Sequence, residues 1–453
     1  MVNHKRSLPV RRIAFALLAI SVYALLLNIS IDIPREQQSV IAVAGLVAVL
    51  WFTETIPLFA TALIIPVLLV INTGLPQKDV LHAFADPIIG LFFGSFVLAI
   101  ALAKYGFDLR IAHLLSRLTK RSPRKLLFGV ITIAALLGMW ISNTATVSLL
   151  LPIIMLFVVA KHGRTKMPRF TKALLFGLAT GAAVGGMATP VGTAPNALAV
   201  RYLADASISL SFVSWLTIGL PLVVLLVPTI WLTLITLFKP EIKRLPDVKH
   251  ARQLWSTNEV LSLVIVVITI ILWLTEPLHG ITTPIIAVAA AFVIFASGLL
   301  KPADLAKLPF RALILFGGGI ALGDAMVATG VTDSIVSWLF EIIGQQHPYV
   351  ILLALILFAI AITTVASNTA TAALLVPIVL SIALAAGVDP LPLVIGATLA
   401  LSIDFISPVG TPPSTLIHAT GFVHVRDFLY VGTFITVIAA SLLFTVITLY
   451  FVL

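Results

Sequence analysis

The segment SNTATVSLLLPI, residues 142–153, recurs almost unchanged as SNTATAALLVPI, residues 367–378, in the second half of the chain. Serine, asparagine and threonine are favourable helix N-caps, and the apolar residues after each SNT are typical of a helix. Each copy therefore predicts a turn followed by a helix. The first turn of such a helix carries free N–H groups and a partial positive charge.

Two further pairs of segments show that the repeat extends along the chain. TPVGTAPN, residues 189–196, has a counterpart in SPVGTPPS, residues 407–414. FGSFVLAIALAKYG begins at Phe93, and the similar FGGGIALGDAMVATG begins at Phe316. Because the three pairs occur in the same order in both halves, they indicate an internal duplication.

The composition places the chain in a lipid bilayer. Hydrophobic residues make up 60% of the sequence and charged residues 10%, whereas soluble proteins carry about 25% charged residues. Apolar runs of roughly 17–25 residues recur along the chain, which is the length of a helix that crosses the hydrocarbon core. We therefore predict an all-α polytopic membrane protein. The absence of cysteine excludes disulfides and thiol chemistry.

The placement of basic residues predicts the orientation in the membrane. Of the 28 Lys and Arg residues, 25 fall in six segments that we assign to the cytoplasm, namely 1–12, 104–125, 161–172, 239–253, 299–311 and 418–427. Because basic loops resist translocation, we predict a plasma (inner) membrane protein with its N-terminus in the cytoplasm and its C-terminus outside. The net charge of +10 is then an orientation signal and not a nucleic-acid surface. Residues 109–124 are basic and amphipathic, and we expect them to lie along the cytoplasmic interface.

The repeat and the loop charges together predict the domain organisation. We expect about 11 transmembrane helices plus two re-entrant hairpins. Five crossings separate equivalent points of the halves, and an odd number inverts the second copy relative to the first. The predicted units are an N-terminal tail and first transmembrane helix (1–37), a first inverted repeat (38–237), a cytoplasmic linker (238–256) and a second inverted repeat (257–453).

Each SNT motif is predicted to form the tip of a hairpin. One apolar stretch, residues 124–160, is interrupted in its middle by residues 142–144, and both of its ends carry cytoplasmic charge. A chain that enters and leaves on one side is a re-entrant hairpin. Residues 348–386, with the tip at 367–369, repeat the pattern from the outside. Both hairpins are expected to direct a helix N-terminus at the middle of the protein.

The second motif pair is predicted to break two helices. Pro190, Gly192 and Pro195 interrupt the apolar residues 170–204, and four such residues interrupt residues 391–421, namely Pro408, Gly410, Pro412 and Pro413. Proline frees carbonyl groups, which is tolerated at membrane depth only around a cavity. Freed carbonyls, hydroxyls and asparagine oxygens suit Na⁺, and helix N-termini suit carboxylates. Alternatively, Ser, Thr and Asn hold membrane helices together, but two copies, each beside a broken helix, favour binding.

These residues match a known family. The two SNT motifs, the GTAPN and GTPP breaks, and WFTETIPLFATALIIPV from Trp51 resemble the divalent-anion/sodium symporter (INDY-type) family of di- and tricarboxylate transporters over nearly the whole chain. The resemblance implies a homodimer in the bilayer that works as an elevator, in which one part moves against a fixed scaffold. It also implies secondary active, Na⁺-coupled import of small carboxylate anions such as succinate, fumarate and malate, with no organic cofactor.

The resemblance also implies the site residues. One Na⁺ would be held by Ser142, Asn143 and Gly192, and the other, largely through backbone carbonyls, by Thr363, Ala366, Asn368 and Gly410. The substrate would contact Asn143, Thr144, Thr193, Asn368, Thr369 and Pro412. This sequence departs from the family at Gly138 and Ser414, where many members have serine and asparagine.

Two acidic residues at membrane depth leave alternatives open. Asp404 could carry a coupling proton or serve as a structural partner, and Asp324 is the other buried acid. Together they raise the alternative of an intramembrane aspartyl protease, which would not be expected to show an inverted repeat. The closer alternative is an anion exchanger on the same fold. The absence of HExxH and of a Walker motif excludes a zinc protease of that type and makes ATP hydrolysis an unexpected energy source.

Overall fold

The computed structural model describes residues 8–30, 32–119, 121–158, 167–244, 255–335, 346–408 and 410–452. The described residues form helices joined by short turns and contain no strand, which confirms the predicted all-α class. Among them, seven helices are long and apolar enough to cross a membrane, and six apolar helices are shorter. The protein is therefore a multi-pass integral membrane protein. One of the seven long helices is half of the second hairpin, so the number of crossings stays a prediction.

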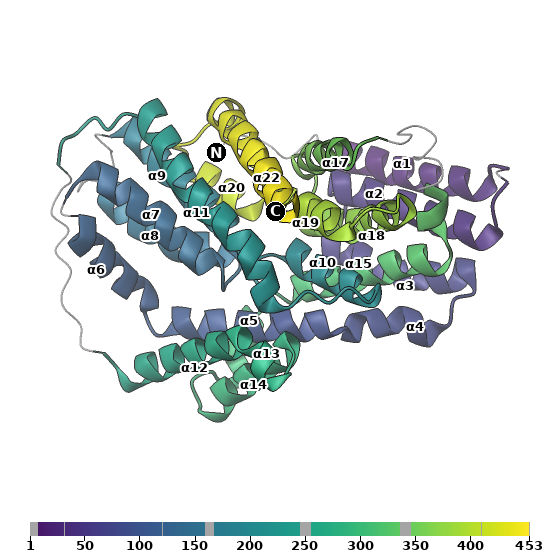
Figure 1. Ribbon diagram of the computed structural model, residues 1–453, viewed down its shortest axis with the longest axis horizontal. Coiled ribbons are helices and arrows are strands. Elements are labelled where there is room, and N and C mark those ends of the chain that lie inside the picture. Colours follow the sequence, from purple (N-terminus) through teal and green to yellow (C-terminus); the bar gives the residue numbers. More distant parts are fainter. Residues whose placement is uncertain are drawn as a thin grey trace.

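The described part of the chain begins with five α-helices. They are α1 (Leu8–Asn28), α2 (Arg35–Thr53), α3 (Leu58–Thr73), α4 (Gln77–His82) and α5 (Pro87–Lys104). Asp86 starts α5, because its side chain accepts a hydrogen bond from the N–H of Ile88 at 2.9 Å and Pro87 fits the first helical position. In Figure 1, α5 lies in the lower part of the molecule, and α12 and α14, which pack against it, lie below it.

The remaining elements of the first half include the first hairpin and the first broken helix. They are α6 (Phe107–Thr119), α7 (Pro123–Gly138), α8 (Asn143–Val158), α9 (Pro168–Gly186), α10 (Ala194–Asp205) and α11 (Phe212–Leu237). The predicted amphipathic segment 109–124 is one helix only as far as Thr119, because Ser122 caps a new helix that begins at Pro123.

The second half repeats these parts. It contains α12 (Thr257–Leu274), α13 (Glu276–His279), α14 (Thr283–Ala296), the 3₁₀ segment η2 (Pro302–Lys307), α15 (Phe310–Ala328), α17 (Pro348–Thr363), α18 (Asn368–Ala385), α19 (Pro390–Ala400), α20 (Pro412–Ala419), α21 (Val425–Asp427), the π-helical turn η3 (Phe428–Gly432) and α22 (Thr433–Val452). Helices α17 and α18 form the second hairpin, and α19 and α20 are the two parts of the second broken helix.

The two halves exchange contacts in a reciprocal way. Helix α8 of the first hairpin packs against α9 and against α20 of the second half, whereas α18 of the second hairpin packs against α19 and against α10 of the first half. Figure 1 shows α7 and α8 on one side of the molecule and α18 and α19 on the other. Each hairpin therefore packs against the first part of the broken helix in its own half and against the second part of the broken helix in the other half.

Small residues let the first hairpin approach its broken helix closely. A Cβ atom at Gly181 would lie 2.7 Å from the carbonyl oxygen of Ile131, and one at Gly185 would collide with the backbone of Ala135. Glycine on the face of α9 that meets α7 therefore allows backbone-to-backbone packing, which is the usual way in which membrane helices associate. This packing fixes the height of the first SNT tip relative to the break in α9–α10.

Candidate functional site

Both SNT tips and both helix breaks line one cavity of about 540 Å³, within the usual size range of small-molecule sites. Its motif residues come from four separate segments and include Ser142, Asn143, Thr144, Gly192, Thr193, Ser367, Asn368, Thr369, Gly410, Thr411 and Pro412. Thr363 and Ala366 do not line the cavity and are buried behind the second tip. The structure thus brings the six residues that the resemblance implies as substrate contacts to one cavity, from both halves of the chain.

A chain of hydrogen bonds holds the first break against the first hairpin. The Thr189 hydroxyl lies 2.5 Å from the carbonyl oxygen of Met139 and accepts a hydrogen bond from the N–H of Gly192 at 3.1 Å. The Asn196 amide donates to the carbonyl oxygens of Gly186 and Thr189, both at 2.8 Å. These bonds satisfy the backbone that Pro190 leaves unpaired. Sequence reasoning missed Asn196, although it is the last residue of the TPVGTAPN motif.

Three buried oxygens at the first tip lack hydrogen-bond partners among the described residues. They are Asn143 Oδ1, Thr193 Oγ1 and Asn196 Oδ1. Asn143 and Thr193 converge at Gly186, where a Cβ atom would lie 2.9 Å from Asn143 Oδ1 and 2.6 Å from Thr193 Cγ2. Buried oxygens without a partner carry a desolvation cost unless a ligand meets them. Their chemistry is that of hard-cation ligands or of acceptors for a bound donor.

The second tip has a different internal arrangement. The Thr363 hydroxyl lies 2.7 Å from Asn368 Oδ1 and 3.1 Å from the carbonyl oxygen of Leu401, and it can donate to either. This contact ties the end of α17 to the start of α18 across the turn. Asn143 Oδ1 has no equivalent bond among the described residues, so the two asparagine oxygens differ in whether a protein donor already occupies them. A ligand at the second tip must compete with the threonine for Asn368, whereas one at the first tip meets a free oxygen.

The rest of the cavity wall is mostly apolar. Phe92 and Phe96 of α5 and Phe316 of α15 line it, and the rings of Phe92 and Phe316 are 4.6 Å apart. Lys307 of η2 is the charged residue among the described residues that line the cavity. Its ammonium lies 2.8 Å from Asp304.

Asp304 connects this lysine to α5. The Asp304 carboxylate accepts a hydrogen bond from Lys104 at 2.7 Å and another from its own loop, the N–H of Lys301 at 2.9 Å. Together with the bond from Lys307, they hold the pKa of the Asp304 carboxyl well below its usual range. The hydrogen bond from Lys104 has the largest effect, followed by those from the Lys301 backbone and from Lys307. Two lysines therefore share one carboxylate, which leaves a net positive charge at this edge of the cavity.

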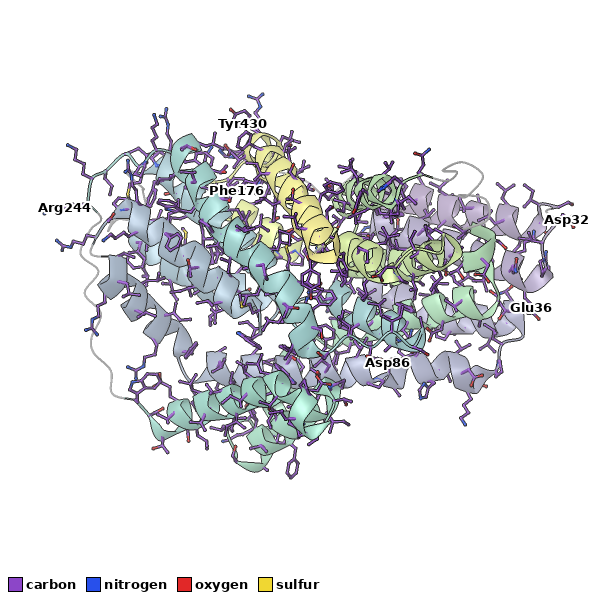
Figure 2. All side chains as sticks on the ribbon, in the orientation of Figure 1. Asp32, Glu36, Asp86, Phe176, Arg244 and Tyr430 are labelled. Carbon is purple, nitrogen blue, oxygen red and sulfur yellow. The ribbon has the colours of Figure 1, made fainter. Side chains whose placement is uncertain are left out.

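The two candidate acids occupy different surroundings. Asp324 of α15 accepts hydrogen bonds from the two terminal guanidinium nitrogens of Arg201, at 2.5 and 2.8 Å, and Arg201 Nε donates to Asp86 at the start of α5 at 2.9 Å (Figure 2 labels Asp86). Asp404 instead borders a small cavity between α9 and α20, to which α15 contributes no residue. The two acids of the protease alternative are therefore in different places: Asp324 is ion-paired, and Asp404 has no ion-pair partner among the described residues.

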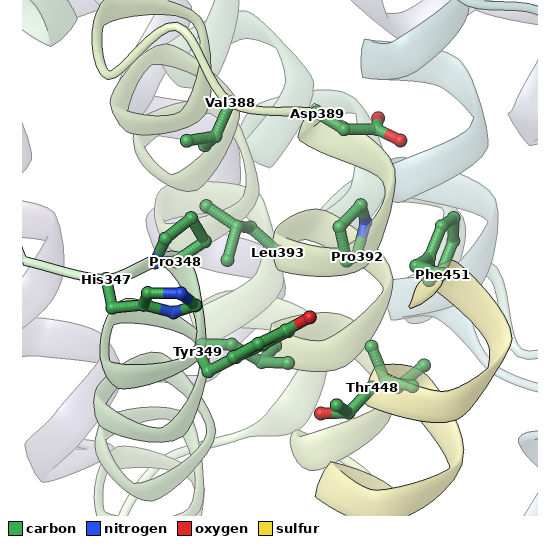
Figure 3. Close-up of a pocket in the computed structure, with 11 residues that line it drawn as sticks. His347, Pro348, Tyr349, Val388, Asp389, Pro392, Leu393, Thr448 and Phe451 are labelled. Atoms are coloured by element: carbon green, nitrogen blue, oxygen red, sulfur yellow. The ribbon is translucent and has the colours of Figure 1, made fainter. Parts of the chain in front are cut away.

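A second hollow, of about 320 Å³, lies away from the motifs. It is bounded by the start of α17, the start of α19 and the end of α22, and Figure 3 shows His347, Tyr349, Asp389 and Thr448 around it. None of the SNT or proline-break residues lines it. The motif cavity is therefore the candidate functional site.

Apolar helices around one cavity that is lined by two hairpin tips and two interrupted helices are the arrangement of a membrane transport protein. The sodium:sulfate symporter transmembrane family matches residues 11–453 of the chain. The protein belongs to this family, so it is a transporter and not an enzyme. The family membership predicted from the motifs is confirmed.

Individual relatives cover most of the chain. An uncharacterized transporter of Haemophilus influenzae is 31% identical over 444 residues and aligns with 95% of each chain. The sodium-dependent dicarboxylate transporter SdcS of Staphylococcus saprophyticus is 31% identical, over 91% of this chain and 85% of that protein. SdcS of Staphylococcus aureus is 30% identical, over 92% and 86%. The YdaH transporter of Alcanivorax borkumensis shares the fold, with a TM-score of 0.55, 16% identity and coverage of 97% and 98%.

Proposed function

We propose that the protein is a secondary active transporter that couples Na⁺ to the import of C4-dicarboxylates such as succinate, fumarate and malate, or of related di- and tricarboxylates. The observation that carries the proposal is the single cavity lined by both SNT tips and both helix breaks. The names of the SdcS relatives, sodium-dependent dicarboxylate transporters at about 30% identity, support the same substrate class.

The chemistry of the cavity suits an anion that is accompanied by cations. Helices α8 and α18 start at Asn143 and Asn368, and their free N–H groups suit carboxylate oxygens. Thr144, Thr193, Thr369 and Pro412 complete the proposed substrate contacts. One Na⁺ would be held by Ser142, Asn143 and Gly192, and the other by Thr363, Ala366, Asn368 and Gly410 as oxygen ligands. Oxygen-only ligand sets of this kind suit a hard cation.

Coupling to Na⁺ is energetically sufficient for uptake. At −100 mV inside, a dianion entering the cell works against about 4.6 kcal/mol, and two co-transported Na⁺ cancel this charge. With a tenfold inward Na⁺ gradient, each ion then contributes about 1.4 kcal/mol, which is enough for roughly 100-fold accumulation. Two Na⁺ ions are therefore the minimum that makes import of a dianion concentrative without working against the membrane potential.

Alternating access is proposed to use the elevator movement of a homodimer. Helices α5 and α15 would belong to the fixed scaffold, and the two hairpins with the broken helices would move. The mostly apolar wall that α5 and α15 contribute to the cavity fits a sliding surface, because few hydrogen bonds would have to be broken there.

Transport in proteoliposomes tests the proposal. Vesicles without internal anion are given an inward Na⁺ gradient, and the uptake of labelled succinate, fumarate, malate, citrate and sulfate is measured. We expect concentrative uptake of a C4-dicarboxylate that needs external Na⁺ with a Hill coefficient above one. Replacement of Na⁺ by choline at equal ionic strength is the control.

The alternative on the same fold is an exchanger. Uptake that requires internal dicarboxylate and is indifferent to Na⁺ would contradict symport and establish exchange. Concentrative uptake of sulfate in place of dicarboxylates would leave the Na⁺ coupling and overturn the substrate class.

A further inference from the structure

Asp404 is a buried carboxylate that the proposed sodium sites do not use. It lies in the non-helical segment between α19 and α20, and 2% of its surface is exposed. The backbone N–H of Ser407 lies near it, but neither carboxylate oxygen has a hydrogen-bond partner of standard geometry among the described residues. An isolated carboxylate in such a place is costly unless a positive charge meets it.

The carboxylate faces a cavity of about 10 Å³, the size of one water molecule or one small cation. Three hydroxyl-bearing residues, Thr180 of α9 and Thr411 and Ser414 of the second break, line the cavity together with Asp404. Its other walls are apolar and are formed by Phe176, Ala179, Ala183, Phe405, Ile417 and Phe428. Figure 1 shows α20 beside α9, and Figure 2 labels Phe176 in this region.

The protein itself provides little compensation for this charge. Among the described residues, no Lys or Arg forms an ion pair with Asp404. The start of α20 is poor in donors, because Pro412 and Pro413 have no N–H and the N–H of Ser414 is directed at the Thr411 hydroxyl at 3.4 Å. The hydroxyl oxygens keep lone pairs, since Thr180 donates its proton to the Phe176 carbonyl at 2.7 Å and Thr411 donates to Ser414 at 3.0 Å.

We propose that Asp404, with the hydroxyl oxygens of Thr180, Thr411 and Ser414, binds a third Na⁺. The inference rests on the proposed symport and extends it. The site is distinct from the second sodium site, because Thr363, Ala366 and Asn368 do not line this cavity. It adjoins the substrate cavity, with which it shares Ala183 and Thr411, and a Cβ atom at Gly410 would collide with the Asp404 carboxylate.

A third Na⁺ changes the charge balance of the cycle. Two Na⁺ cancel a dianion, so a third makes import carry one positive charge inward. Uptake then responds to the membrane potential, and a tenfold Na⁺ gradient raises the limiting accumulation about tenfold further. Without Asp404 the cycle returns to two ions per dianion and becomes electroneutral.

A measurement of transport stoichiometry tests this proposal. Proteoliposomes take up ²²Na⁺ and labelled dicarboxylate while K⁺ and valinomycin set the membrane potential, and the ratio of the two uptakes is determined. We expect a ratio of three and stimulation by an inside-negative potential for the native protein, and a ratio of two without stimulation for Asp404→Asn. Asp389→Asn is the matched control, because it removes an exposed carboxylate outside both sodium-binding regions and leaves an amide oxygen to cap α19. The control should keep the ratio of three.

A second variant covers the case in which Asp404→Asn does not fold. Ser414→Ala removes one ligand oxygen and no charge, and we expect the Na⁺ concentration for half-maximal uptake to rise about threefold to tenfold. An unchanged Na⁺ dependence in Ser414→Ala overturns the site.

Other outcomes separate this inference from the proposed function. A native ratio of two, a ratio of three retained by Asp404→Asn, or coupling of the third charge to a pH gradient in place of Na⁺ overturns the third sodium site and leaves symport intact. If the native protein shows no Na⁺-dependent carboxylate uptake, the proposed function itself is overturned.

Discussion

At the scale of single residues, the two tip asparagines carry the strongest prediction. Asn143→Ala and Asn368→Ala should each abolish concentrative uptake while folded protein remains, because each removes an oxygen or an amide donor from a buried ligand at a cost of about 1–3 kcal/mol. Uptake is measured at matched expression. Asn28→Ala is the control, because this asparagine is exposed and, among the described residues, its side chain bonds the carbonyl oxygen of Ala24 in its own helix α1. Near-normal uptake in either tip variant would make that motif a helix-packing element.

The unequal partners of the two asparagines add a finer expectation. Asn143 Oδ1 has no hydrogen-bond partner among the described residues, whereas Asn368 Oδ1 lies 2.7 Å from the Thr363 hydroxyl. Loss of Asn368 also removes a bond between α17 and α18, so this variant should lose more thermal stability than Asn143→Ala.

Gly192 is predicted to be intolerant of any side chain. A Cβ atom there would lie 2.7 Å from Gly186 Cα and 2.9 Å from the carbonyl oxygen of Gly138. Backbone cannot move aside as a side-chain tip can, so Gly192→Ala should destabilise the protein by about 1–3 kcal/mol and abolish uptake. Gly90→Ala is the control, because its Cβ would meet only the side chain of Val288, at 3.2 Å. Equal melting temperatures for the two variants would contradict the predicted backbone collision.

At the scale of elements, Arg201 joins three helices. It lies on α10 and bonds Asp324 on α15 and Asp86 at the start of α5. Asp324→Asn should lower the stability by about 1–3 kcal/mol, less than for a fully buried pair because the Asp324 side chain is 40% exposed. Thermal unfolding of the purified protein measures the effect.

The matched control for this variant is Asp205→Asn. Asp205 faces the same arginine at 3.4 Å but is 58% exposed, so its loss should change the melting temperature little. A melting temperature lowered equally by both variants would show that charge removal in general, and not the tie between α10 and α15, is responsible. In the proposed elevator cycle this tie must break, so Asp324→Asn should also alter the rate of uptake.

At the scale of the whole molecule, the topology is the central prediction. The basic-residue distribution predicts a cytoplasmic N-terminus and an external C-terminus. Because the chain contains no cysteine, a single cysteine added at either end is a unique label for a membrane-impermeant thiol reagent. We expect labelling from outside only at the C-terminus. Labelling of both ends from one side would contradict the odd number of crossings and the inverted repeat with it.

The sequence by itself determined the helices and the motif geometry. The hairpins predicted at 124–160 and 348–386 match α7–α8 and α17–α18, and the interruptions predicted within 170–204 and 391–421 match the breaks between α9 and α10 and between α19 and α20. These features rest on local chemistry. SNT caps start helices, proline interrupts them, and apolar length sets where a helix can cross lipid. The duplication then indicated that the motifs would meet at one site.

Only the tertiary structure decided which charged residues meet. Arg201 pairs with Asp324, 123 positions away, and Lys104 pairs with Asp304, 200 positions away. Nothing in the local sequence distinguishes Asp324, which has a guanidinium partner, from Asp404, which faces a cation-sized cavity. A side chain's neighbours in a helical bundle depend on the rotation and height of helices distant in sequence. Helix capping and hydrophobic length do not specify that arrangement. It depends instead on tertiary packing, such as the backbone-to-backbone contacts at Gly181 and Gly185.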